Sequence, residues 1–370
     1  MQNIITLNNN IRLLLNGHET FSALKDALTH AERSINLEYF SFHDDETGNA
    51  IKDILTERAG KGVTVRMILD SAGSWRLSKR FKRELKDSGI NLQMFMPLTL
   101  QNLNSRIIHR DHRKIITVDG ITGFLGGFNI GDVYLKQWRD THLKIDGDAV
   151  SELERIFFSM WNKNKNKNKN SGHDDSELFR PCINGSCDNV PVKIIAGGTG
   201  NEFRAVADEY VRIINCAKKR IWITTPYFVP DKKFLNALCM AALNGVDVRI
   251  IIPSWSNHPL VSWASQSYID SLLTNGIKIY VYRDRFIHAK TMIADSHVAS
   301  VGTANLDALS FEINYEVQAF VYSTRLVREL EDVFIQDLSN CTEETKEKRI
   351  NRPLTSKIKS GIGRLLSSYL

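Results

Sequence analysis

The sequence predicts an α/β protein built from two similar domains, because the two halves of the chain repeat the same order of elements. The segment 35–45 matches 221–231, and the segment 61–70 matches 244–253. Each matched segment contains a short apolar strand, and an amphipathic helical stripe precedes the first strand of each half. The two stripes are Phe21, Leu24, Leu28 and Ala31, and Phe203, Val206, Tyr210 and Ile213. Helices that alternate with strands predict a largely parallel or mixed sheet in each half.

A polar segment separates the halves. Positions 162–170 read NKNKNKNKN, and turn-forming residues follow them, so this stretch can bury little apolar surface. We therefore expect a first domain at 1–161, a linker at 162–189, a second domain at 190–340 and a basic tail at 341–370.

The repeat carries a motif with identical internal spacing, His-x-Lys-x4-Asp-x6-Gly-x2-Asn. The first copy is His112, Lys114, Asp119, Gly126 and Asn129, and the second is His288, Lys290, Asp295, Gly302 and Asn305. On a strand, His-x-Lys places an imidazole and an ammonium group on one face. Such a pair can attack a phosphodiester and neutralise its oxygens. Two copies supply one pair for each side of the phosphorus, which predicts that both motifs meet at the interface between the domains.

Other residues of the repeat predict supporting roles. Asp140 follows the first motif histidine at the same distance as Glu316 follows the second. We expect these carboxylates to stand behind the histidines of their own halves and to orient the rings. From their spacing, Asp119 and Asp295 are predicted to be turn and ion-pair residues that hold the motif. The amides of Asn129 and Asn305 can donate to phosphate oxygens.

Charge and composition bound the partners. The net charge is +6, and the segment 348–370 contains six cationic residues and no acidic one. The rest of the chain is therefore neutral, which argues against a nucleic-acid groove and for contact between the tail and an anionic membrane surface. The cationic residues are Lys348, Arg349, Arg352, Lys357, Lys359 and Arg364.

The sequence predicts a peripheral position on the cytoplasmic side of the membrane. It has no apolar run of about 18 residues and no secretory signal, and its odd number of cysteines suggests free thiols. Apolar residues of the tail fall on one helical face, which is typical of an interfacial helix; packing of this stripe on the second domain is the alternative. These residues are Leu354, Ile358, Ile362, Leu365 and Leu366.

The chain resembles the phospholipase D superfamily with two HKD motifs, and within it the bacterial cardiolipin synthases. The narrower resemblance rests on TTPYFVPD (224–231), HAKTMIADSHVASVGTANLD (288–307), SFEINYE (310–316) and WRDTHLKIDGDAV (138–150). It covers nearly the whole chain. It implies two phospholipase D-type domains related by pseudo-two-fold symmetry, with one active site between them.

The resemblance implies transfer of a phosphatidyl group from one phosphatidylglycerol to another through a phosphohistidine, with release of glycerol and without metal or cofactor. It assigns His112 as nucleophile and His288 as acid and base, although the near-symmetry leaves the choice open. The family motif also counts Lys114, Asp119, Lys290 and Asp295 among the catalytic residues. A phospholipase D-type hydrolase is the main alternative, and an HKD nuclease is a weaker one.

Overall fold

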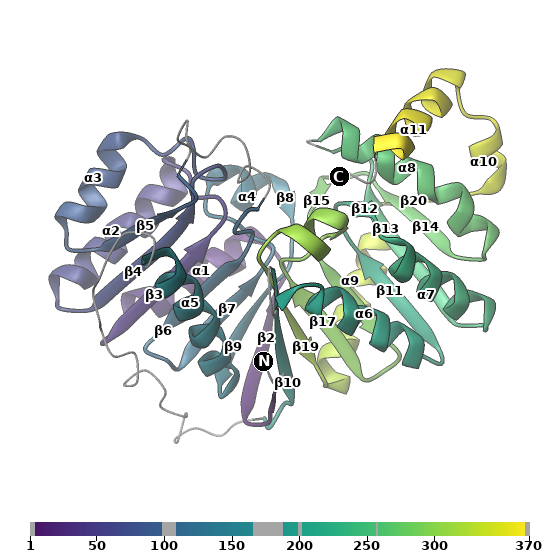
Figure 1. The fold of residues 1–370 in the computed structure, drawn as a ribbon. Coiled ribbons are helices and arrows are strands. Elements are labelled where there is room, and N and C mark those ends of the chain that lie inside the picture. The colour runs from purple at the N-terminus through teal and green to yellow at the C-terminus, as the bar shows by residue number, and fades with distance from the viewer. Residues whose placement is uncertain (1–3, 98–108, 166–187, 199–201, 257, 367–370) are drawn as a thin grey trace.

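The computed structural model describes residues 4–97, 109–165, 188–198, 202–256 and 258–366. It confirms the α/β class: two halves of similar architecture lie side by side, each a twisted sheet with helices (Figure 1).

Within the described residues, the first half contains a seven-stranded sheet and five helices. In spatial order its strands are β2 (Asn9–Leu14), β9 (His142–Gly147), β7 (Thr122–Gly126), β6 (Lys114–Val118), β3 (Ser34–Tyr39), β4 (Thr64–Asp70) and β5 (Asn91–Phe95). Its helices are α1 (Gly17–Thr29), α2 (Glu46–Gly60), α3 (Lys79–Asp87), α4 (Asp132–Gln137) and α5 (Ala149–Lys165).

The second half contains a nine-stranded sheet. In spatial order its strands are β1 (Ile5–Thr6), β10 (Val192–Gly197), β19 (Glu316–Val321), β17 (Val298–Gly302), β16 (Thr291–Ala294), β11 (Arg220–Thr224), β13 (Asp247–Pro253), β14 (Lys278–Tyr282) and β20 (Cys341–Glu344). Its helices are α6 (Ala205–Cys216), α7 (Lys232–Leu243), α8 (Pro259–Thr274), a π-helix (Leu309–Ile313), α9 (Thr324–Leu338), α10 (Lys346–Ile350) and α11 (Leu354–Leu366).

The two sheets have the same topology. In each, three parallel strands (β3, β4 and β5, or β11, β13 and β14) are followed across the sheet by antiparallel neighbours that begin with the motif strand. The motif strands are β6 and β16, which hold equivalent places. The second sheet has two additional edge strands, β1 and β20.

The sheets face each other across a shared apolar core. Ile115 and Leu143 of the first sheet and Val301 and Val317 of the second are fully buried in one cluster, which α5 and α9 also join. The opposite face of the first sheet packs on α1, α2 and α3, and that of the second on α6, α7 and α8. The alternation of apolar residues along each strand therefore builds both the domains and their interface.

Several sequence expectations differ from the structure. Phe203 was expected in a buried stripe, but it precedes α6 and is 53% exposed. Residues 162–165 continue α5 instead of starting the linker, of which 166–187 lie outside the described residues. Ile5–Thr6 pairs with the second sheet rather than the first, and Cys341–Glu344, expected in the tail, forms its edge strand β20. Short edge strands such as these are added by pairing, which apolar periodicity does not reveal.

Candidate active site

Two short backbone bridges join the domains next to the motif histidines. Strand β15 (Phe286–Ile287) pairs in parallel with β8 (Trp138–Arg139) of the first half, and the His288 N–H donates to the Arg139 carbonyl at 2.7 Å. In the same way Asp111 forms a parallel bridge with Tyr315, and the His112 N–H donates to the Tyr315 carbonyl at 3.0 Å. Each bridge places a motif histidine beside the residue that follows its hydrogen-bond partner, which is Asp140 after Arg139 and Glu316 after Tyr315.

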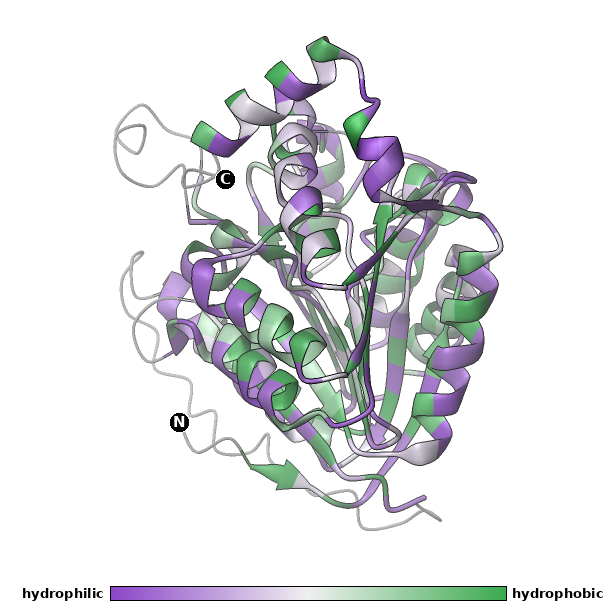
Figure 2. Cartoon of the chain, turned by 90° about the vertical axis from the view of Figure 1, so that its right-hand side faces the viewer, coloured by the Kyte–Doolittle hydropathy of each residue, from purple (hydrophilic) through white to green (hydrophobic). Residues whose placement is uncertain are grey.

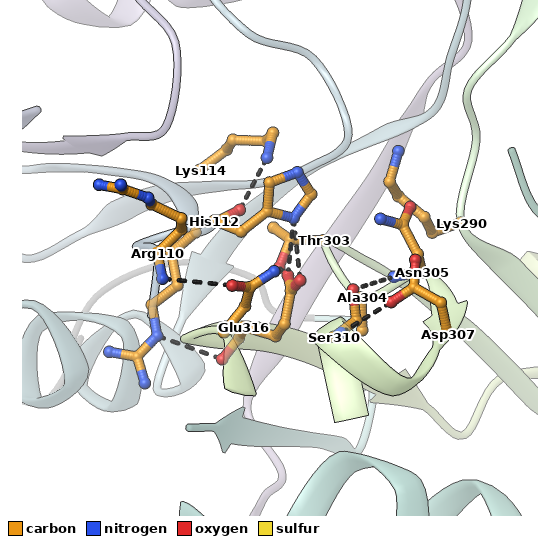
Figure 3. A network of polar contacts seen from close by, with 12 residues as sticks. Arg110, His112, Lys114, Lys290, Thr303, Ala304, Asn305, Asp307, Ser310 and Glu316 are labelled. Carbon is orange, nitrogen blue, oxygen red and sulfur yellow. Dashed lines mark hydrogen bonds and ion pairs between the residues drawn. The ribbon is translucent and has the colours of Figure 1, made fainter. Parts of the chain in front are cut away.

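In each case this residue is the carboxylate that follows the motif histidine of the other half at the shared offset. The Nδ1 atom of His112 lies 2.9 Å from Oε1 of Glu316, and the Nδ1 atom of His288 lies 2.7 Å from Oδ2 of Asp140 (Figure 3 shows the first pair). The expectation that each carboxylate serves the histidine of its own half was therefore wrong. Both pairs cross the interface, so each domain supplies the carboxylate that contacts the histidine of the other.

The residue after each motif glycine lies against one of the two carboxylates. Thr303, after Gly302, donates its hydroxyl to Oε2 of Glu316 at 2.5 Å. The corresponding residue of the first half is Gly127, where a Cβ atom would lie only 2.1 Å from Oδ1 of Asp140. A side chain at position 127 would thus collide with the carboxylate that orients His288.

Aromatic rings hold the imidazoles in place. The ring centroid of Phe40 lies 5.0 Å from that of His112, and the ring of Trp138 lies 4.6 Å from that of His288. Phe286 packs on both Trp138 and His288, at 4.8 and 5.8 Å. These edge and tilted contacts limit ring rotation around each carboxylate contact.

The motif lysines lie next to the histidines. The ammonium group of Lys290 is 2.8 Å from Nδ1 and 2.9 Å from Nε2 of His288, so it sits against the ring. The ammonium group of Lys114 donates to the His112 carbonyl at 2.7 Å. Both lysines are buried (Lys114 0% and Lys290 2% exposed), so their charges act in a site with little water.

Burial disfavours isolated charges in this site. It lowers the pKa of His112 and of His288 well below the usual imidazole value, and the nearby ammonium groups add to the effect. Burial also raises the pKa of Glu316 to about 8, and it lowers the pKa of Lys290 to about 7 and that of Lys114 to about 8. Burial in this site therefore favours neutral imidazoles, which are able to act as nucleophiles or bases.

Two buried arginines connect the site to the other domain. Arg113, between His112 and Lys114, donates to the carbonyls of Glu316 and Gly197 at 3.1 Å each and forms an ion pair with Glu202. Arg139, next to Asp140, makes two hydrogen bonds to Asp337 of α9. The backbone around each catalytic pair is thus fixed by charged contacts across the interface.

The motif asparagines occupy different settings. The side-chain oxygen of Asn129 accepts a hydrogen bond from the backbone N–H of Ser41 at 3.2 Å. The side-chain oxygen of Asn305 is buried and has no partner among the described residues. Figure 3 shows Asn305 and Lys290 on one side of the network, opposite His112 and Lys114.

The motif aspartates lie at the far ends of the motif strands. Asp119 directly follows β6 and accepts hydrogen bonds from the backbone N–H groups of Glu32, Arg33 and Ser34. Asp295 follows β16 and accepts from those of Lys218, Lys219 and Arg220. Both have positive φ, as the turn requires. These contacts agree with the motif-holding role read from the spacing and place neither carboxylate against the histidines.

Phe40, Gly127, Trp138 and Thr303 are among the contacts of the site that were not predicted from the sequence. Three of these had a signal, because Gly127 and Thr303 occupy the same motif position and Trp138 lies two residues before Asp140. Nothing in the pattern pointed to Phe40. Among the described residues no group of three or more potential ligand side chains is placed to hold a metal ion.

Two α/β domains that join a His-x-Lys pair from each half at one interface have the architecture of the phospholipase D superfamily. A solved phosphatidylserine synthase from Haemophilus influenzae Rd KW20 shares this fold with a TM-score of 0.72 at 15% identity, covering 99% of this chain and 95% of that one. A polyphosphate kinase from Porphyromonas gingivalis matches with a TM-score of 0.61 at 13% identity, covering 98% of this chain and 53% of that one. These likenesses concern the fold.

Sequence comparison gives the family. The family model described as "Cardiolipin synthase, PLD-like domain" matches residues 24–161 and 210–338. The major cardiolipin synthase ClsA of Bacillus subtilis is 38% identical over 99% of this chain and 77% of its own length. A cardiolipin synthase from Geobacillus is 42% identical over 99% of this chain and 73% of its own. The chain belongs to the cardiolipin synthase family of phospholipase D-like proteins.

Replacing Glu316 with glutamine, or Asp140 with asparagine, should lower kcat by roughly a hundred- to ten-thousand-fold, because the amide no longer selects the ring tautomer. The matched control is Glu202→Gln, which removes a carboxylate paired with Arg113 but not with a histidine. Steady-state rates together with thermal unfolding separate the effects. Near-normal kcat in the Glu316 and Asp140 variants would contradict the orienting role.

Replacing Asp119 or Asp295 with alanine should act on stability instead. Each loses the acceptor for three backbone N–H groups, so we expect the free energy of unfolding to fall by roughly 1–2 kcal/mol. The pH dependence of kcat should stay as in the unchanged protein. Denaturant titration and a pH–rate profile test this, and a shifted pH profile at unchanged stability would place the aspartates in the chemistry.

Proposed function

We propose that the protein is a cardiolipin synthase that transfers a phosphatidyl group from one phosphatidylglycerol to a second one and releases glycerol. The observation that carries the proposal is the contact of each motif histidine with a carboxylate of the other domain. These contacts supply a nucleophile and an acid from opposite domains to one phosphate. The 38–42% identity to cardiolipin synthases over 99% of the chain supports transfer over hydrolysis.

In the first displacement, His112 acts as nucleophile. Glu316 engages Nδ1, so the Nε2 lone pair attacks phosphorus and forms an N–P bond. The bond from phosphorus to the glycerol oxygen of the headgroup breaks, and His288 gives that oxygen its proton. The products are glycerol and a phosphatidyl group on His112. His112 is the more exposed imidazole, with 12% of its side chain accessible against 5% for His288, which supports this assignment.

In the second displacement, the neutral His288 takes a proton from the terminal glycerol hydroxyl of another phosphatidylglycerol. The resulting oxygen attacks phosphorus, the N–P bond breaks, and cardiolipin leaves while His112 regains its lone pair. Burial favours the neutral form of both imidazoles, and the incoming phosphodiester anion opposes this effect. Its negative charge favours a proton on His288, so the substrate itself prepares the acid.

Lys114 and Lys290 are proposed to stabilise the phosphoryl oxygens, with the amides of Asn129 and Asn305 in support. Their charges are buried beside both histidines, where a developing negative charge meets little competing water. Asp119 and Asp295 support the reaction only by holding the turns after the motif strands.

An aromatic series connects the site to the surface. Trp255 is 52% exposed and packs on Phe286 at 4.8 Å, Phe286 packs on Trp138 at 4.8 Å, and Trp138 packs on His288 at 4.6 Å. An apolar route of this kind suits a lipid substrate better than a nucleic acid, whose backbone requires basic grooves. We therefore propose phospholipid substrates and no nucleic-acid partner.

Attachment to the membrane is proposed through α11. Four of its apolar residues face solvent, so the alternative that this stripe packs on the second domain was wrong: Leu354 is 72%, Ile358 54%, Ile362 42% and Leu365 80% exposed. The helix packs on α8 through Ser360 and Gly363 instead. Figure 2 shows α11 across the top of the molecule, with hydrophobic positions recurring along its outer side. The side chain of Leu366 lies outside the described residues.

None of the described helices is long and apolar enough to cross a bilayer. The exposed stripe and the cations beside it support peripheral binding to an anionic surface. We propose the cytoplasmic side of the membrane as the location.

Purified protein incubated with phosphatidylglycerol vesicles should yield cardiolipin and glycerol, as measured by lipid mass spectrometry. His112→Ala should abolish turnover, and His288→Ala should accumulate phosphatidyl-enzyme when the donor carries a good leaving group that needs no acid. Phosphatidic acid as the single product would instead support the hydrolase. A phosphohistidine that forms in the His112 variant but not in the His288 variant would reverse the two roles.

The pH dependence should reveal the buried lysines. In the free enzyme, Lys290 and Lys114 lose their protons as pH rises through about 7 and about 8, so kcat/KM for the anionic diester should fall above this range. A bound phosphodiester favours the charged ammonium form, and the alkaline fall of kcat should therefore lie at higher pH. Profiles with dispersed short-chain phosphatidylglycerol test this. Coinciding alkaline limbs would show that the lysines do not contact the phosphate.

A further inference from the structure

A basic groove lies between α8, α10 and α11, outside the catalytic site. Its volume is about 710 Å³, and five of the residues that line it are cationic: Lys346, Arg349, Arg352, Lys357 and Arg364. Among the described residues of its lining, Asp270 is the one acid. The groove thus concentrates positive charge at the upper edge of the second domain, where Figure 1 shows α8, α10 and α11.

The one acid of the described lining contacts two of the cations. Asp270 is shared by two guanidinium groups, with Oδ1 2.7 Å from Nε of Arg349 and Oδ2 2.9 Å from Nη2 of Arg352. Arg349 is 4% exposed and makes further hydrogen bonds to Gln266, so it belongs to the wall of the groove. Lys357, also in the lining, donates to the Ile350 carbonyl at 2.9 Å.

One donor points to an anionic ligand. The Nη1 atom of Arg352 is buried and has no hydrogen-bond partner among the described residues. The repulsion from Arg349 adds to burial in lowering the pKa of Arg352, so both effects disfavour the charge of this guanidinium group. A phosphate oxygen would supply both the missing acceptor and the missing negative charge.

The apolar surface beside the groove indicates which kind of phosphate compound the groove binds. Ile350, which lines the groove, is 71% exposed, and the exposed stripe of α11 begins at Leu354, four residues further on. Free phosphate would not need such a surface. A membrane lipid would place its phosphate among the cations and its acyl chains beside the stripe.

We propose that this groove binds the phosphodiester headgroup of an anionic phospholipid and holds α11 on the membrane, at a site separate from the catalytic pocket. The inference rests on the proposed function in one respect, that the enzyme works at a lipid surface. The bound lipid acts as an attachment point and undergoes no reaction there.

The test compares two double variants of the full chain that remove the same charge. Arg352→Gln with Lys357→Gln changes the groove, and Lys348→Gln with Lys359→Gln changes α10 and α11 outside its lining. Flotation with vesicles of phosphatidylglycerol and phosphatidylcholine gives the affinity. General attraction to the surface predicts equal losses, of roughly fivefold per cation. A headgroup site predicts that the groove variant loses at least about tenfold more than the control, and equal losses would overturn the proposal.

Three further readouts keep the result interpretable. Turnover of dispersed short-chain phosphatidylglycerol should be unchanged in both double variants, so failure of the groove and failure of the synthase function are distinguishable. Lys357→Gln alone is the second test if loss of Arg352 disturbs the fold, as thermal unfolding would show. Millimolar inorganic phosphate should not release the protein from vesicles beyond chloride of equal ionic strength; specific release would assign the groove to free phosphate and contradict a lipid site.

Discussion

The hydrogen bonds between each motif histidine and a carboxylate of the other domain are the constraint on which the structure depends. They require that Asp111 pair with Tyr315 and that β8 pair with β15, because these bridges set which residues face each other. They also require the apolar packing between the sheets, where Ile115 and Val317 are fully buried. The packing of the domain interface therefore also sets the geometry of the site. Neither half of the chain alone contains a complete histidine–carboxylate pair.

Burial keeps the two imidazoles neutral and therefore reactive, and it also disfavours the charged groups around them. Removing water disfavours each charge on Glu316, Asp140 and the two lysines, and it leaves the imidazoles neutral. We propose that the phosphodiester anion of the substrate favours the charged form of the two ammonium groups and of one imidazole, so that the charge of the lipid headgroup takes part in the mechanism.

Much of this could be predicted from the sequence. The repeated order of helices and strands predicted the two-domain α/β fold, the equal offsets predicted that Asp140 and Glu316 lie behind histidines, and the resemblance indicated the family. The crossed pairing could not be predicted, because equal offsets in both halves fit pairing within a half as well as pairing across the interface. Only the contacts of Asp111 with Tyr315 and of Ile287 with Arg139 decide between them. The exposure of Phe203 and the edge strands β1 and β20 likewise depend on contacts between distant segments.

The most direct test of crossed pairing is proton NMR of the protein with ¹⁵N-labelled histidine, in which Nδ1 protons bound to carboxylates appear far downfield. Glu316→Gln should remove the downfield signal of His112 and keep that of His288, and Asp140→Asn should do the reverse. His112→Ala and His288→Ala assign the two signals. Loss of the His288 signal in the Glu316 variant, with that of His112 retained, would show pairing within each half and contradict the account.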